Sequence, residues 1–102
     1  MDIQITIAEL EKEWEQPTGF LGRLRMGVFD PSGLERLVQV LQSVEMEDTT
    51  TVNRRFVALA WYIPIFMVWQ RERVEEQGGN VQKLDLAINR IQGLLETILG
   101  VP

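Results

Sequence analysis

The sequence predicts an all-α fold, with residues 1–102 forming a single-domain bundle of four principal helices. Apolar residues recur every three or four positions through the long segments, which is the period of an amphipathic helix. Capping residues, glycines and prolines stand between those segments. A run of 14 residues without charge, from Phe56 to Trp69, predicts a central helix that the other helices cover on every side.

The first helix is predicted to begin at Thr6. The segment Thr6-Ile7-Ala8-Glu9 matches a capping box, in which the threonine and glutamate side chains satisfy exposed backbone donors. The apolar residues that follow lie on one stripe: Ile7, Leu10 and Trp14. A proline and a glycine, at positions 17 and 19, end this helix. Residues 20–29 then fit either a short helix or an irregular turn, because Gly22 and Gly27 weaken a helix there.

The second long helix starts from a strong local signal. Asp30 suits the N-cap, and Pro31 suits the first helical position, where its missing N–H costs nothing. Helical spacing then continues through Leu34, Leu37, Val38, Leu41 and Val44. Residues 45–51 are predicted to form a polar, acidic connection.

The third helix is predicted to run from Val52 or Asn53 to Gln77, with either a kink near residues 60–64 or two helices meeting there. Proline removes the bond to the carbonyl of residue 60 and crowds the preceding turn. We expect these side chains to be largely buried: Phe56, Leu59, Ala60, Ile63, Met67 and Trp69. If the Trp61 ring is buried too, its replacement by alanine should cost roughly 3–5 kcal/mol.

The last helix is predicted over Val81–Leu99. Two glycines at 78 and 79 end the preceding helix, and Asn80 caps the new one. Gly100 stands where a C-terminal glycine belongs. The inner face of this last helix is predicted to carry Leu84, Ala87, Ile88, Ile91, Leu94, Leu95 and Ile98.

The composition excludes several functional classes. The chain has no cysteine and no histidine, which removes disulfides, the usual zinc ligands and the usual general base. Ser32 and Ser43 are the only serines, and neither lies in a nucleophile elbow. We therefore expect no enzyme activity, no metal and no cofactor.

Charge and hydropathy limit the partners. The net charge is −5, with ten acids and four bases in residues 1–51 but five acids and six bases in residues 52–102. Nucleic acid is not an expected partner, because phosphate contacts need a basic face. The start of the chain has no secretion signal, and the apolar run is shorter than the roughly 20 residues of a membrane span, so a cytoplasmic protein is expected.

Acidic residues supply the candidate site. The predicted partner-binding residues are Glu9, Glu11, Glu13, Glu15, Glu45, Glu47 and Asp48. On a helix the first four spread over the outer surface, so they form either a docking face for a basic protein or an ordinary solvated face. The other three lack the glycine and terminal glutamate of a calcium loop.

The chain resembles the small acidic bacterial immunity proteins that neutralise polymorphic or contact-dependent toxins. The stretches with this character are 19–25 with Phe29-Asp30, and 61–64 with 69–74. The resemblance implies a cytoplasmic, helical, non-catalytic module that binds a basic toxin domain through its acidic surfaces. The alternative is a helical domain that binds a lipid-like ligand or a second copy of itself through residues 56–69, if four helices do not cover that run completely.

Overall fold

The computed structural model describes residues 2–45 and 52–102, and every regular element within those ranges is helical. The described residues form seven helices: α1 (Ile3–Trp14), α2 (Phe20–Arg25), α3 (Pro31–Gln42), α4 (Arg54–Trp61), α5 (Ile63–Trp69), α6 (Arg71–Glu76) and α7 (Val81–Leu99). The all-α prediction is confirmed. The expected division into four helices is too coarse, because residues 20–25 form a helix of their own and residues 54–76 form three.

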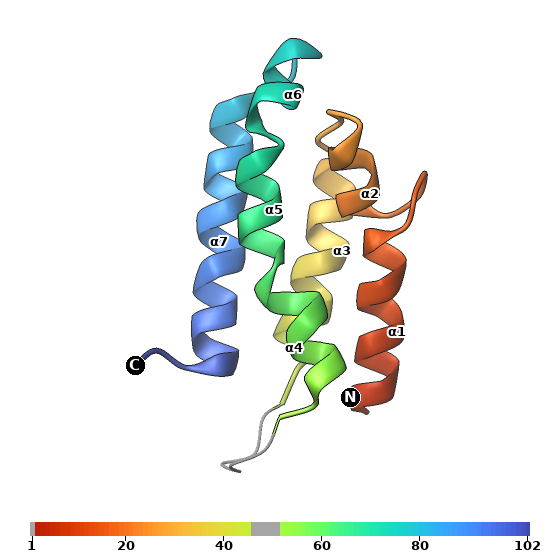
Figure 1. Ribbon diagram of the computed structural model, residues 1–102, viewed down its shortest axis with the longest axis vertical. Coiled ribbons are helices and arrows are strands. Elements are labelled where there is room, and N and C mark those ends of the chain that lie inside the picture. Colours follow the sequence, from red (N-terminus) through yellow and green to blue (C-terminus); the bar gives the residue numbers. More distant parts are fainter. Residues whose placement is uncertain (1, 46–51) are drawn as a thin grey trace.

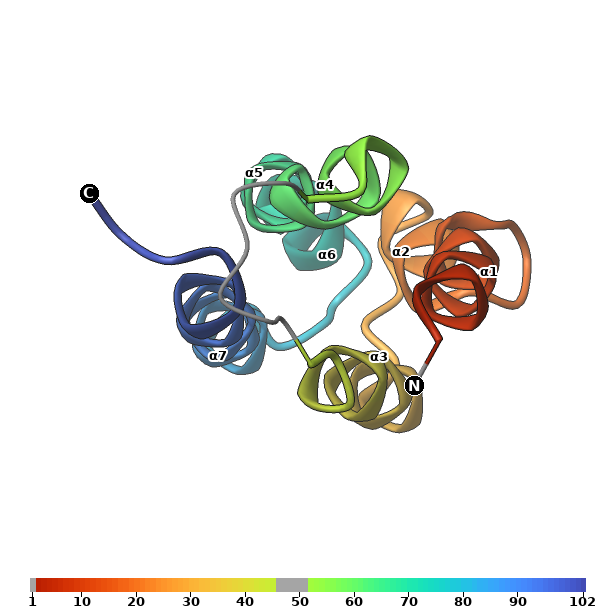
Figure 2. The ribbon, with the colours of Figure 1, turned by 90° about the horizontal axis from the view of Figure 1, so that it is seen from below.

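The helices surround one apolar core. Viewed along the long axis, α1, α3, α7 and the α4–α5 pair enclose a common centre (Figure 2). The longest helix, α7, runs along most of the length of the molecule, with α5 beside part of it, and α6 continues beyond α5 at one end (Figure 1). The largest fully buried side chains come from every helix except α6: Leu10, Phe20, Leu21, Leu24, Leu37, Val38, Leu41, Phe56, Ile63, Met67, Leu84 and Ile91. No helix among the described residues is long and apolar enough to cross a membrane.

Most of the predicted helix ends are confirmed. Asn53 accepts a 3.0 Å hydrogen bond from the Phe56 N–H, and Asn80 accepts one of 3.1 Å from the Lys83 N–H. Gly100 follows α7 with a φ of 84°. Asp30 is the N-cap of α3 but makes no capping bond, because its carboxylate instead accepts a 3.2 Å bond from Arg23.

The predicted capping box at Thr6 is wrong. Helix α1 begins at Ile3, and Asp2 is its N-cap, accepting a 3.1 Å hydrogen bond from the Gln4 N–H. Aspartate is a preferred N-cap, and an earlier start extends the helix by a full turn. Thr6 is consequently a buried interior residue whose hydroxyl donates to the Asp2 carbonyl.

Residues 20–29 contain the short helix α2, which packs unusually close to the loop before it. A Cβ on Gly22 would collide with the carbonyl oxygen of Glu15, and a Cβ on Gly19 would collide with the carbonyl oxygens of residues 12 and 13. The same glycines that lower helix propensity therefore allow α2 to lie against the end of α1. This close approach is a tertiary reason for glycine that periodicity does not reveal.

The chain breaks next to Pro64, as predicted. Helix α4 ends at Trp61 and α5 begins at Ile63, with Tyr62 between them. The carbonyl of Leu59 accepts a 3.1 Å hydrogen bond from the indole Nε1–H of Trp14 on α1. A second break, at Gln70, separates α5 from α6 and was not predicted.

Candidate interaction surface

The apolar segment 56–69 is covered on one side only. The expected burial is confirmed for Phe56, Leu59, Ala60, Ile63 and Met67. It is wrong for Trp69, whose exposed fraction is 64%, and the Trp61 ring is 50% exposed. Helix α1 packs against α4, and α7 packs against α5. The consecutive helices α4 and α5, here called the α4–α5 rod (the α4–α6 rod when α6 is included), face solvent on the side opposite α1 and α7.

The exposed large apolar side chains of this segment are together called the strip. It consists of Trp61, Ile65, Val68 and Trp69, with exposed fractions between 37% and 64%. The half-buried Tyr62 lies behind it, with its ring centroid 5.4 Å from that of Trp61 and 5.7 Å from that of Trp69. Both ring pairs are edge-to-face, which is a favourable arrangement for aromatic side chains. The rings are therefore held in place before any partner arrives.

Two shallow hollows adjoin Trp61. The one toward α7 has a volume of about 350 Å³ and is lined chiefly by Trp61, Ile65, Leu95 and Leu99. The one toward α1, of about 450 Å³, is lined by side chains that include Trp14, Trp61, Tyr62, Arg25 and Arg55. The Trp61 ring thus stands as a ridge between two recesses, a shape that suits an uneven protein surface better than a small enclosed ligand.

Trp61→Ala is expected to lower the free energy of unfolding by about 1–2 kcal/mol, because half of the ring is already in water and solvent can fill the space it leaves. This is well below the loss expected for a buried ring. The midpoint and slope of urea unfolding measure it. A loss of 3 kcal/mol or more would place the ring in the core and remove it from the strip.

Glu13, one of the predicted partner-binding acids, does not face outward. Its exposed fraction is 5%. One carboxylate oxygen accepts a 2.9 Å hydrogen bond from the Phe20 N–H at the start of α2, and both oxygens accept bonds of 3.3 Å from the Arg36 guanidinium on α3. Arg36 also donates to the Thr18 carbonyl. The expectation that all four α1 glutamates spread over the outer surface is wrong at Glu13, because a tertiary partner recruits that side chain inward.

The contact with Glu13 changes the pKa of Arg36. The hydrogen bond from Arg36 to Glu13 raises the pKa of the guanidinium, with attraction to the carboxylates of Glu13 and Asp30 adding to the effect and burial opposing it. Arg36 therefore stays charged wherever the protein is folded. The pair fastens α1, the following loop, α2 and α3 together, and its role is structural.

The other predicted acids differ in their surroundings. Glu9 pairs with Lys12 at 3.3 Å and Glu11 pairs with Arg55 at 3.2 Å, so both charges are partly offset within the chain. Glu15 and Glu45 are exposed. Glu47 and Asp48 lie outside the residues that the structure describes. Within the described residues, Glu15 and Glu45 are thus the predicted partner-binding acids that remain exposed.

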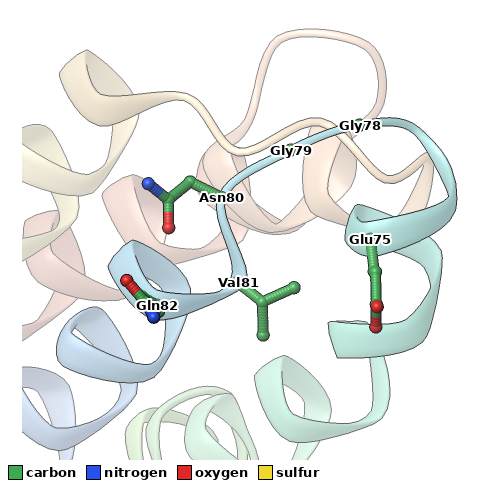
Figure 3. Close-up of a pocket in the computed structure, with 6 residues that line it drawn as sticks. All are labelled: Glu75, Gly78, Gly79, Asn80, Val81 and Gln82. Atoms are coloured by element: carbon green, nitrogen blue, oxygen red, sulfur yellow. The ribbon is translucent and has the colours of Figure 1, made fainter.

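A further hollow lies at the turn between α6 and α7, with a volume of about 580 Å³. Glu75 and Val81 face this space, whereas the Asn80 side chain points away from Glu75 (Figure 3). Asn80 is also occupied in capping α7. The polar groups therefore do not converge, and no three carboxylates among the described residues are placed to hold a metal ion.

Sequence comparison gives no independent guide to the role of these surfaces. The chain matches no protein-family model, no curated protein and no solved structure. The resemblance to immunity proteins therefore stays a prediction.

Proposed function

We propose that the protein is a non-catalytic protein-binding module and that the strip is its contact surface. The observation that carries this proposal is the exposure of two tryptophans about two helical turns apart, Trp61 and Trp69, with Ile65 and Val68 between them. Contiguous apolar surface of this kind is costly to leave in water and is typical of interaction sites. Tryptophan is also enriched among the residues that contribute most to binding.

The size of the strip suits a protein partner. Two half-exposed tryptophans with an isoleucine and a valine present about 400 Å² of apolar surface, which is the apolar centre of a standard interface with about 800 Å² per partner. Charged side chains border it, including Arg55 and Arg25, whose guanidinium carbon lies 5.2 Å from the Phe66 ring centroid. An apolar centre with a polar margin is the usual arrangement of a reversible contact.

A toxin domain is a second candidate partner, on the basis of the acids that remain at the surface. Glu15 and Glu45 are exposed, and the net charge of −5 would speed association with a basic protein. In this form of the proposal the strip supplies the apolar contact of an immunity protein, and the acids orient the toxin before contact.

Site-specific photocrosslinking in cells tests the proposal. A photoreactive phenylalanine analogue at Val68 samples the strip, the same analogue at Glu15 samples the acidic end of α1, and one at Asn89, exposed on α7, is the control. We expect one discrete product from Val68 and none from Asn89. A discrete product from Glu15 that contains a toxin domain would support the immunity form.

The contrary result is equally clear. If Val68 and Asn89 give the same products, or neither gives any, the strip is not a contact surface. A product from Glu15 alone would move the contact from the strip to α1.

A further inference from the structure

The solvent side of the α4–α6 rod has a regular pattern that extends beyond the strip. Seven exposed residues follow one another at alternating intervals of four and three positions: Arg54, Ala58, Trp61, Ile65, Val68, Glu72 and Glu75. This is the spacing of a helix face that meets another helix. The chain bends at Tyr62 and breaks again at Gln70, but both residues keep right-handed backbone angles, and exposed residues at this spacing recur on both sides of each break.

The charges along this face have an order. A cation, Arg54, stands at its beginning, apolar residues occupy its middle, and two anions, Glu72 and Glu75, stand at its end. Turned end for end, the same face would present its anions to the cation and its apolar middle to the apolar middle. In a two-fold symmetric contact the same surface of both copies meets in opposite directions, so the surface must be complementary to itself when reversed.

We infer that the strip binds a second copy of this chain, with the two α4–α6 rods antiparallel and Ile65 at the two-fold axis. The inference rests on the proposed role of the strip as a contact surface and names its occupant. In this arrangement Trp61 of each copy lies against Val68 and Trp69 of the other, and Arg54 of each copy lies opposite Glu75 of the other. A parallel arrangement is disfavoured, because it would place arginine against arginine and glutamate against glutamate.

The area is consistent with a reversible dimer. Each copy contributes about 400 Å² of apolar strip, and the flanking charged residues bring the total buried surface to about 1,200 Å², the lower end of specific interfaces. Such an interface is expected to hold at micromolar rather than nanomolar concentration. The monomer would also remain folded, because the buried core does not include the strip.

Sedimentation of the full chain tests the inference. At about 50 µM the protein is expected to sediment at twice the mass of one chain, as interfaces of this size dissociate in the micromolar range. Ile65→Lys places two like charges at the axis and should give a monomer, and Val68→Lys should do the same from the more exposed neighbouring turn. Circular dichroism of both variants must show an unchanged helix signal.

A charge swap tests the orientation. Arg54→Glu or Glu75→Arg alone should weaken the dimer about tenfold, since each change converts two attractive pairs into repulsive ones. The double variant restores both pairs and should recover the original dissociation constant. Glu15→Arg, the same change of charge on α1, is the control and should leave the dimer unaffected.

Each outcome has one meaning. A wild-type chain that is monomeric at this concentration, or a dimer that Ile65→Lys and Val68→Lys leave intact, would overturn the inference. A strip-dependent dimer without rescue by the double swap would overturn the antiparallel arrangement. If the wild type is monomeric while Val68 still crosslinks to another protein, the proposed function stands and only the second copy is rejected; if Val68 gives no product and no dimer forms, both fail.

Discussion

Gly22→Ala is expected to lower the free energy of unfolding by about 3 kcal/mol, the upper end of the usual cost of overpacking. Helix propensity alone predicts the opposite sign, because alanine is favoured over glycine inside a helix by about 1 kcal/mol. The structure decides between them: the added methyl group would meet the backbone carbonyl of Glu15, and backbone cannot rotate away as a flexible side chain can. Either α2 or the preceding loop must move.

Gly93→Ala is the matched control. Gly93 lies inside α7, and a Cβ there would meet no atom within 4 Å. The change should therefore stabilise the protein by about 0.5–1 kcal/mol. Urea unfolding of both variants, with the slope checked for constancy, measures the contrast. Two variants of the same sign would show that α2 does not approach the Glu15 backbone as closely as described.

Glu13→Ala is expected to cost about 2–3 kcal/mol, because it leaves the Phe20 N–H without its acceptor and removes the carboxylate that holds Arg36. The estimate lies below the full cost of breaking a buried ion pair, since the Arg36 side chain is 49% exposed and can turn to water. Thermal unfolding followed by circular dichroism measures the loss.

Two further variants separate the contributions of the charge, the hydrogen bond and surface exposure to this loss of stability. Glu13→Gln keeps an oxygen for the Phe20 N–H but loses the charge, so it should cost about 1 kcal/mol, roughly one net hydrogen bond. Glu9→Ala removes an acid that is paired at the surface with Lys12 and should change stability by less than about 0.5 kcal/mol. Equal losses for Glu9→Ala and Glu13→Ala would mean that Glu13 is an ordinary surface acid.

The parts of the fold that local chemistry determines could be predicted from the sequence. Pro64 lacks an N–H wherever the chain places it, so a break beside it follows from the residue itself. Asn53 and Asn80 cap the helices that follow them because the capping bond spans only three residues. The start of α1 was misplaced because Asp2 and Thr6 are both acceptable caps, and only the packing of the whole helix chooses between them.

The candidate site could be predicted only in part, because burial depends on distant partners. The inward turn of Glu13 requires Arg36, which lies 23 positions later in the chain. The exposure of Trp69 is invisible in a run that is apolar on all sides, since composition gives it no outer face. The sequence did contain one signal of this exposure. The helical face of Trp61, Ile65 and Val68 continues to Arg54 in one direction and to Glu72 in the other. A fully buried face would not carry such charged residues.

The hydrogen bond from Trp14 to the Leu59 carbonyl has a consequence for the order of folding. The two residues are 45 positions apart in the chain. The Leu59 carbonyl, next to the bend between α4 and α5, can therefore accept this bond only after α1 has packed against α4. Closing so long a loop carries an entropic cost that a continuous helix would avoid, and contacts of this separation slow folding. The bend at Tyr62 is caused locally by Pro64, but the hydrogen bond that stabilises it depends on a distant residue. We therefore expect the bend to reach its final form late in folding.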